Sequence, residues 1–192
     1  MIAFITSVVM LVIFLPIPII LFLLHTCIRL WRKIGRATYR IAAVVWFALG
    51  VLIILLRKYL LTSALSFPLS AKLIGLLLVA GGFVLSAVAQ KHLSLQRLIG
   101  MPQILPEVRK QRLITTGIYG KIRHPRYLSY ILILEGWFLF SGYIVFPVIA
   151  LALLVIIPLE EHELIKRFGQ AYLKYRQQVP ALAPQLWSRK KQ

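Results

Sequence analysis

The run IAFITSVVMLVIFLPIPIILFLL, from Ile2 to Leu24, decides the fold class of this chain. It carries no charged residue, and it exceeds the roughly 20 residues that a helix needs to cross a hydrocarbon core about 30 Å thick. The run is also longer than the apolar core of a signal peptide, so we interpret it as a retained membrane span. Pro16 and Pro18 predict a kink within it, which membrane helices tolerate when neighbouring groups satisfy the freed carbonyls.

Two further apolar runs have the length of a transmembrane helix. We predict a second span from about Ile41 to Leu61 and a third from about Ala71 to Gln90. The third contains small residues at which neighbouring helices can approach closely, namely Gly75, Ala80, Gly81 and Gly82.

Two shorter apolar runs follow a polar stretch that extends from Lys91 to Tyr127. The first, Leu128 to Phe140, is too short to cross the membrane as a straight helix. Together with Tyr143 to Ile157, beyond the break at Ser141-Gly142, it predicts a helical hairpin that is either tilted or stops short of the far surface. Pro158 predicts a boundary after this hairpin.

The segment from Glu160 to Gln178 predicts an amphipathic helix, because apolar residues recur in it every three to four positions. Such a helix lies on the membrane surface or packs over a site there. The sequence therefore predicts an all-α polytopic membrane protein with three transmembrane helices, a helical hairpin and a C-terminal amphipathic helix.

The charge distribution predicts both the partners and the orientation of the chain. Of 192 residues, 60% are hydrophobic, yet the net charge is +18. Because the basic residues lie between apolar runs, they favour contact with anionic lipid head groups, and we expect no nucleic-acid partner. With the N-terminus outside, the two cytoplasmic loops hold five and eight Lys and Arg and the tail holds seven, against three outside. This asymmetry places both polar clusters and the C-terminus in the cytoplasm.

The cysteine and histidine content argues against a disulfide framework and against a metal site. Cys27 is the single cysteine, so no intrachain disulfide is possible. The histidines fall at no recognisable ligand spacing, so we expect none of them to bind a metal. They are His25, His92, His124 and His162.

Two polar clusters carry the residues that indicate chemistry. They are LITTGIYGKIRHPRYLS, from Leu113 to Ser129, and LEEHELIKRFGQAYLKYRQQVPALAP, from Leu159 to Pro184. They resemble the isoprenylcysteine carboxyl methyltransferase family and the related bacterial phospholipid methyltransferases. That family carries T-x-G-x-Y, then RHPxY, a helical hairpin, a Glu-Glu pair and FGxxYxxYxxxVP, and this chain keeps the spacing over roughly its last eighty residues.

The resemblance implies an enzyme that binds S-adenosylmethionine and methylates a lipid-like or prenylated acceptor. The apolar runs predict a three-span membrane region, residues 1–90, and the resemblance implies a catalytic region within residues 91–192. Carried over by position, the cofactor contacts are Gln111, Arg112, Leu113, Ile114, Tyr119, His124, Pro125, Arg126, Tyr127 and Glu160. The residues expected to act on the reacting groups are His124, Glu161 and Arg123.

The residue types suit this cofactor on chemical grounds. A carboxylate such as Glu160 can hold the ammonium or the ribose diol through charge-assisted hydrogen bonds. Tyr119 and Tyr127 can stack on adenine, offer hydroxyls, or attract a sulfonium through their ring faces. An amine or thiol acceptor must lose a proton, for which His124 and Glu161 are the nearest candidates, whereas a carboxylate needs no base.

Several alternatives remain open on the sequence. Glu135 lies inside an apolar run and either lines the acceptor path or is a neutral residue hydrogen-bonded between helices. The stripe of Phe168, Tyr172 and Tyr175 favours packing over binding. The protein is alternatively a non-catalytic scaffold, or an NADPH-dependent reductase, although no GxGxxG fingerprint is present.

Two departures from the eukaryotic carboxyl methyltransferases bear on the acceptor. Where those enzymes have an Arg four residues before the first Glu of the pair, this chain has Ile156, and it has Gln178 where a basic residue precedes Val-Pro. An Arg is the natural partner of an acceptor carboxylate, so these positions weaken the case for a prenylcysteine.

Overall fold

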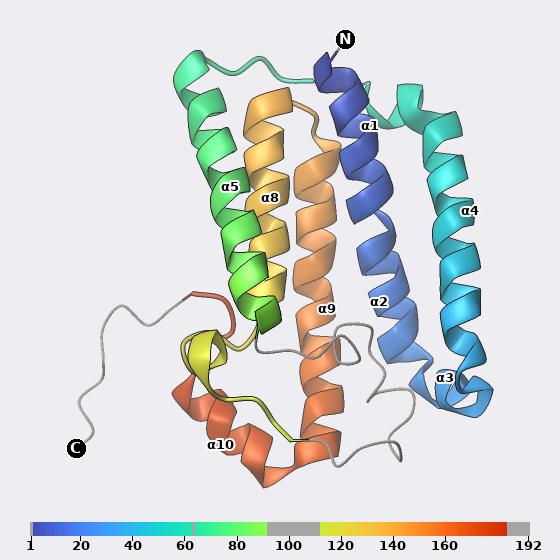
Figure 1. The fold of residues 1–192 in the computed structure, drawn as a ribbon, viewed down its shortest axis with the longest axis vertical. Helices are drawn as coiled ribbons and strands as arrows, with labels where there is room; N and C mark the ends of the chain where they lie inside the picture. The colour runs from blue at the N-terminus through green and yellow to red at the C-terminus, as the bar shows by residue number, and fades with distance from the viewer. Residues whose placement is uncertain (1, 63, 92–111, 184–192) are drawn as a thin grey trace.

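A computed structural model describes residues 2–62, 64–91 and 112–183, and its secondary structure is helical apart from one isolated bridge. Long helices run side by side along the bundle, with the N-terminus at the end opposite α10 (Figure 1). The helices are α1 (Ile2–Phe14), α2 (Pro16–Thr26), α3 (Ile28–Ile34), α4 (Ala37–Leu60), α5 (Leu69–Lys91), the 3-10 helix η2 (Gly117–Gly120), α8 (Pro125–Ser141), α9 (Val145–Phe168) and α10 (Gln170–Gln178). The predicted all-α class is confirmed.

Four segments among the described residues are long and apolar enough to cross a membrane: Ile2–Thr26, Ala37–Leu60, Leu69–Lys91 and Val145–Phe168. The first of them consists of α1 and α2, which meet at Leu15, directly before Pro16. The regular helix is therefore interrupted at the first of the two prolines, since Pro16 cannot donate to the carbonyl one turn earlier. The chain is an integral membrane protein.

The predicted hairpin of α8 and α9 reaches the end of the bundle that carries the N-terminus (Figure 1). Gly142 forms its turn with φ of 82°, a conformation that a side chain would strain. The Leu65 N–H, in the connection between α4 and α5, donates to the Gly142 carbonyl over 2.8 Å. The turn of the hairpin therefore lies beside the connection between the candidate spans α4 and α5.

Helices α5 and α8 pack with their backbones in close contact. A Cβ placed on Gly75 would lie 2.5 Å from the Gly136 carbonyl oxygen, and a Cβ on Gly136 would lie 2.5 Å from the Gly75 carbonyl oxygen. Gly82 meets Ile133 in the same way at 2.6 Å. The small residues of the third span thus hold the middle and end of α8, whose first turn carries the last three residues of the RHPRY motif, against the membrane bundle.

The predicted boundary at Pro158 and the predicted single amphipathic helix from Glu160 to Gln178 are wrong. Helix α9 continues through Pro158 to Phe168. The proline is exposed, and membrane helices tolerate the lost backbone bond. The break comes at Gly169, whose φ of 55° ends α9, and only α10 forms the separate amphipathic piece.

Candidate functional site

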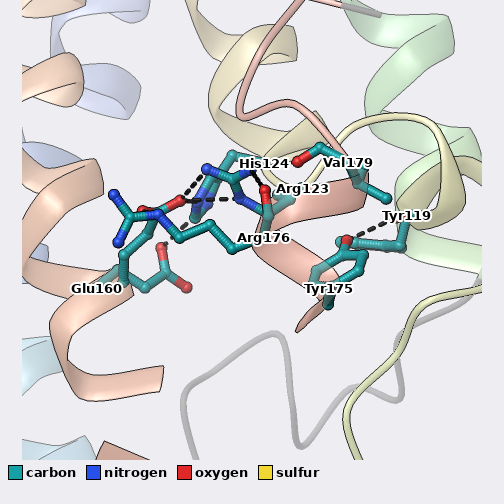
Figure 2. A network of polar contacts seen from close by, with 8 residues as sticks. Tyr119, Arg123, His124, Glu160, Tyr175, Arg176 and Val179 are labelled. Atoms are coloured by element: carbon teal, nitrogen blue, oxygen red, sulfur yellow. Dashed lines mark hydrogen bonds and ion pairs between the residues drawn. The ribbon is translucent and has the colours of Figure 1, made fainter. Parts of the chain in front are cut away.

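A buried cluster of charged side chains joins the RHPRY motif to the Glu-Glu pair (Figure 2). Arg123 donates to Glu161 Oε1 from Nε over 3.0 Å and from Nη2 over 2.6 Å. His124 Nε2 lies 3.1 Å from the same oxygen, and Arg176 Nε lies 3.2 Å from Glu161 Oε2. Glu161 therefore holds the motif loop, α9 and α10 together.

Backbone contacts fix the motif loop against the segment that follows α10. The Arg123 N–H donates to the Pro180 carbonyl and the His124 N–H to the Ala181 carbonyl, each over 2.9 Å. Arg123 Nη1 also donates to the carbonyls of Arg176 and Val179. The segment that begins at Val179-Pro180 therefore supplies backbone carbonyls that accept hydrogen bonds from the motif loop.

A cavity of about 590 Å³ opens beside this cluster, and side chains from both halves of the chain line it. Its lining comprises Ile17, Ile20, Leu21, Leu24, His25, Tyr39, Ala42, Ala43, Trp46, Arg112, Leu113, Ile114, Tyr119, Arg123, His124, Pro125, Arg126, Tyr127, Tyr130, Glu160, Leu164, Arg167, Phe168, Tyr172 and Tyr175. The residues from α2 and α4 are mostly apolar, whereas those from η2, α8 and α9 include most of the charged groups. The cavity thus has one mostly apolar wall and one more polar wall, and its volume is that of a small-molecule site.

Four side-chain atoms in the lining are buried with no hydrogen-bond partner within the described part of the chain. They are His25 Nδ1, Tyr39 Oη, Glu160 Oε2 and Tyr172 Oη. A buried polar atom without a partner is costly, so most such atoms in proteins are paired. Their gathering on one cavity indicates that a polar ligand completes the site.

The tyrosine hydroxyls of η2 and α10 stay protonated at neutral pH. Burial raises the pKa of Tyr119 and of Tyr172, and it raises the pKa of Tyr175 to about 12. The Tyr175 hydroxyl donates to the Tyr119 carbonyl over 2.6 Å, which ties α10 to η2 (Figure 2). The Tyr172 hydroxyl, which lies beside Arg123, is likewise neutral and can donate or accept a hydrogen bond.

Every described residue that was predicted to contact the cofactor lines this one cavity: Arg112, Leu113, Ile114, Tyr119, His124, Pro125, Arg126, Tyr127 and Glu160. Gln111 lies outside the described residues. His124 connects the two motifs, with its ring 5.6 Å from that of Tyr127 and Nδ1 3.8 Å from Glu160 Oε2. Their roles toward a cofactor stay predictions.

The three residues predicted to act on reacting groups do not share one environment. Arg123 and His124 line the cavity, whereas Glu161 is absent from its lining and is bonded to Arg123, His124 and Arg176. Glu135 is half-buried within α8 and is also not among the lining residues. The contacts of Glu161 favour a role in positioning His124.

Comparison with known proteins identifies the family. A profile described as phospholipid methyltransferase matches residues 71–171, more than half of the chain. The chain belongs to the phospholipid methyltransferase family. The matched residues run from α5 through η2, α8 and α9 to the start of α10. They include Arg123, His124 and Glu161 of the charged cluster.

Two curated proteins that are similar to this chain are methyltransferases by name, in agreement with the family assignment. Methanethiol S-methyltransferase 2 from Bradyrhizobium diazoefficiens is 34% identical over 89 residues, which cover 44% of this chain and 34% of that protein. Protein-S-isoprenylcysteine O-methyltransferase B from Arabidopsis thaliana is 33% identical over 81 residues, covering 38% of this chain and 40% of that protein. The chain thus matches two fifths or less of the length of these relatives.

Sequence reasoning missed the part of the site that lies before the family region. Residues of α2 and α4 supply one wall of the cavity, including Leu21, His25, Tyr39 and Trp46. A hydrophobic run shows no preferred face, so nothing in the pattern distinguished these residues from those facing lipid. The sequence favours packing for the stripe of Phe168, Tyr172 and Tyr175. In the structure these side chains pack together, and they also line the cavity.

Proposed function

We propose that this protein is an S-adenosylmethionine-dependent methyltransferase acting on a lipid-like or prenylated acceptor. One observation carries the proposal: the described residues expected to contact the cofactor surround a single cavity that contains the unpaired polar atoms Glu160 Oε2 and Tyr172 Oη. A scaffold needs neither a cavity of this size nor unpaired buried groups, since both lower stability.

The polar side of the cavity fits the chemical groups of this cofactor. The unpaired oxygen of Glu160 suits an ammonium or a ribose diol, because a charged acceptor strengthens each hydrogen bond. Arg112 and Arg126, in the same lining, suit its carboxylate. The rings of Tyr119 and Tyr127 suit the adenine or the sulfonium.

When bound, S-adenosylmethionine supplies a methyl group that is already activated by a sulfonium. The protein's contribution is then to hold donor and acceptor in line, which can provide much of the acceleration. Glu161 holds Arg123 and His124 in place, so that His124 presents its ring to the cavity beside Tyr127. We assign Glu161 this positioning role and leave contact with the ligand to His124 and Arg123.

The site lies at the cytoplasmic face in this proposal. The segments that carry the charged cluster, α9 and α10, end at the same end of the bundle as α3, opposite the N-terminus (Figure 1). That end holds the basic loops, which favour the cytoplasmic side of a membrane. The apolar wall from α2 and α4 supports an acceptor with a lipid-like portion.

Calorimetry on the detergent-solubilised protein tests the proposal. S-adenosylmethionine should bind and NADPH should not, and a labelled methyl group should then appear in a lipid extract of the source membranes. Binding of NADPH alone would instead favour a reductase. Absence of binding by both cofactors would reject the enzymatic assignment in favour of a scaffold.

A further inference from the structure

A second cavity, an open groove of about 460 Å³, adjoins the charged cluster between α9 and the segment that follows α10. We call it the rear groove. Its lining comprises Arg123, Ile157, Pro158, Glu161, His162, Ile165, Arg176 and Ala181. Among the described residues, the two linings share Arg123, whereas Glu161 belongs to the rear groove only. The Arg123–Glu161 ion pair therefore stands between the groove and the main cavity.

Arg176 presents a guanidinium to this groove that the protein uses only in part. The side chain approaches the charged cluster from α10, and its Nε lies 3.2 Å from Glu161 Oε2 (Figure 2). Its side chain is nevertheless 50% exposed and makes no second polar contact within the described part of the chain. Because a guanidinium carries five N–H donors in a planar fork, its two Nη groups suit a phosphate.

The charges of the described lining favour an anion. Arg123 and Glu161 neutralise one another over 2.6 Å, so Arg176 supplies the excess charge. His162 is exposed at the groove and can donate a hydrogen bond from a ring N–H. The electrostatic complement of such a lining is a negatively charged group.

The groove lies at the level of the lipid head groups. His162 is about 26 Å from Val145, the first residue of α9, at the helical rise per residue. The hydrocarbon core of a bilayer is about 30 Å thick, so a span that begins near Val145 approaches the membrane surface at His162. An anion at this level is most readily supplied by the membrane itself.

An exposed apolar stripe on α9 leads from the groove into the bilayer. Val148, Leu151, Val155 and Pro158 recur at intervals of three or four residues, so they share one face of the helix with His162. All four are exposed. A polar groove that heads an exposed apolar stripe has the layout of a phospholipid, whose phosphate stays at the surface while a chain follows the helix.

We propose that the rear groove binds an anionic phospholipid, with its phosphate on Arg176 and His162 and an acyl chain along the exposed stripe of α9. Because Arg176 contacts Glu161, which in turn holds His124, the bound lipid supports the charged cluster from outside the main cavity. This lipid is not the methyl acceptor, since none of the described residues expected to contact the cofactor lines the groove. Its binding does not depend on the proposed function.

Native mass spectrometry of the detergent-solubilised full chain tests the site. The probes are palmitoyl-oleoyl phosphatidylglycerol, palmitoyl-oleoyl phosphatidylcholine and inorganic phosphate. The two lipids carry the same chains, so they differ in the net charge of the head group. We expect saturable retention of phosphatidylglycerol, about fivefold weaker binding of phosphatidylcholine, and no displacement of either lipid by inorganic phosphate.

Substitutions in the groove should weaken the binding of phosphatidylglycerol. Arg176→Gln removes a charge-assisted contact and should weaken it about tenfold. Because this change also removes a contact of Glu161, His162→Glu provides a second test: it places a carboxylate at an exposed position in the groove and should weaken binding to a similar extent.

Lys174→Gln and Lys166→Gln are matched controls. They remove exposed charges from α10 and α9 outside the groove lining, so each should change the affinity less than about twofold. Equal losses in the groove variants and in these controls would overturn the proposal, because binding would then reflect a diffuse attraction to the basic surface.

The remaining outcomes separate the lipid from other ligands and from the proposed function. Equal retention of the two lipids overturns the proposal, and displacement by inorganic phosphate assigns the groove to a free anion instead. Calorimetry with S-adenosylmethionine on the same samples reports on the proposed function. Either result can fail while the other stands, because the two ligands occupy different cavities.

Discussion

Arg123 and Glu161 form an ion pair in the interior of the protein, with Arg123 Nη2 2.6 Å from Glu161 Oε1 and side chains that are 9% and 8% exposed. The two residues are far apart in the chain, one just before α8 and the other within α9. Their pairing closes the hairpin at the end where the cavity lies, and His124 Nε2 shares the same carboxylate oxygen. Several elements of the site therefore depend on one carboxylate.

Breaking this pair should destabilise the protein strongly. Arg123→Gln leaves Glu161 with only Arg176 and His124, and Glu161→Ala leaves the buried Arg123 with only backbone carbonyls, so each change should cost about 3 kcal/mol, the lower end for a broken buried pair. We expect a lowered midpoint of thermal unfolding in detergent for both variants. Lys121→Gln, an exposed change in the same loop, should leave the midpoint within error. A normal midpoint for both pair variants would contradict the structural role given to Glu161.

Glu160→Gln should act on cofactor binding rather than on stability. Glu160 Oε2 has no hydrogen-bond partner among the described residues and lies 3.8 Å from His124 Nδ1, so its charge contributes less to the fold than the charge of Glu161 does. Affinity for S-adenosylmethionine should fall about tenfold, because a charge-assisted bond becomes a neutral one, and His124→Ala should weaken it to a similar extent.

Calorimetry on Glu160→Gln and His124→Ala checks this prediction, with Arg57→Ala as the control. Arg57 lies in the last turn of α4, at the end of the bundle away from the cavity. Its substitution should leave the affinity unchanged. Equal affinities in all three variants would remove Glu160 and His124 from the site.

The glycines of α5 offer a matched pair of substitutions with opposite expected signs. Gly75→Ala places a methyl 2.5 Å from the Gly136 carbonyl oxygen, so α5 and α8 must separate, at about 1–3 kcal/mol. Gly81→Ala meets nothing within 4 Å and should stabilise the helix by about 0.5–1 kcal/mol. Thermal unfolding midpoints measure both, and a lowered midpoint for Gly81→Ala would argue against this packing of α5 on α8.

Alkaline pH should loosen the contact between α10 and η2. Burial raises the pKa of Tyr175 from its usual 10.0 to about 12, so above pH 10 the unfolded chain releases a proton that the folded chain keeps. Stability should therefore fall as pH rises from 10 to about 12 and level off beyond.

Comparison of Tyr175→Phe with the unaltered protein isolates this titration. The variant loses the bond to the Tyr119 carbonyl and should be less stable at neutral pH, but its stability should decline less steeply between pH 10 and 12. Tyr59→Phe removes an exposed hydroxyl and should keep the original slope. Identical slopes in all three proteins would show that Tyr175 is not the titrating group.

The sequence by itself determined the membrane class and the polar motifs of the site. An apolar run such as Ile2 to Leu24 has few alternatives to a membrane helix, since every backbone group must be satisfied within it. The motif residues around His124 and Glu160 were found because polar groups beside apolar runs stand out, and their spacing resembles a family. Helix ends were less certain, as Pro158 shows, because an exposed proline in a long helix is tolerated.

Only the tertiary structure decided which side chains complete the cavity. It separated Glu161, bonded within the charged cluster, from Glu160, which lines the cavity and whose Oε2 has no hydrogen-bond partner among the described residues, although the two are adjacent in sequence. It also brought His25 and Tyr39 to the wall opposite the motifs. The physical reason is that an apolar membrane helix has no polar face in its sequence to set its rotation, so helix packing alone selects the residues that point inward.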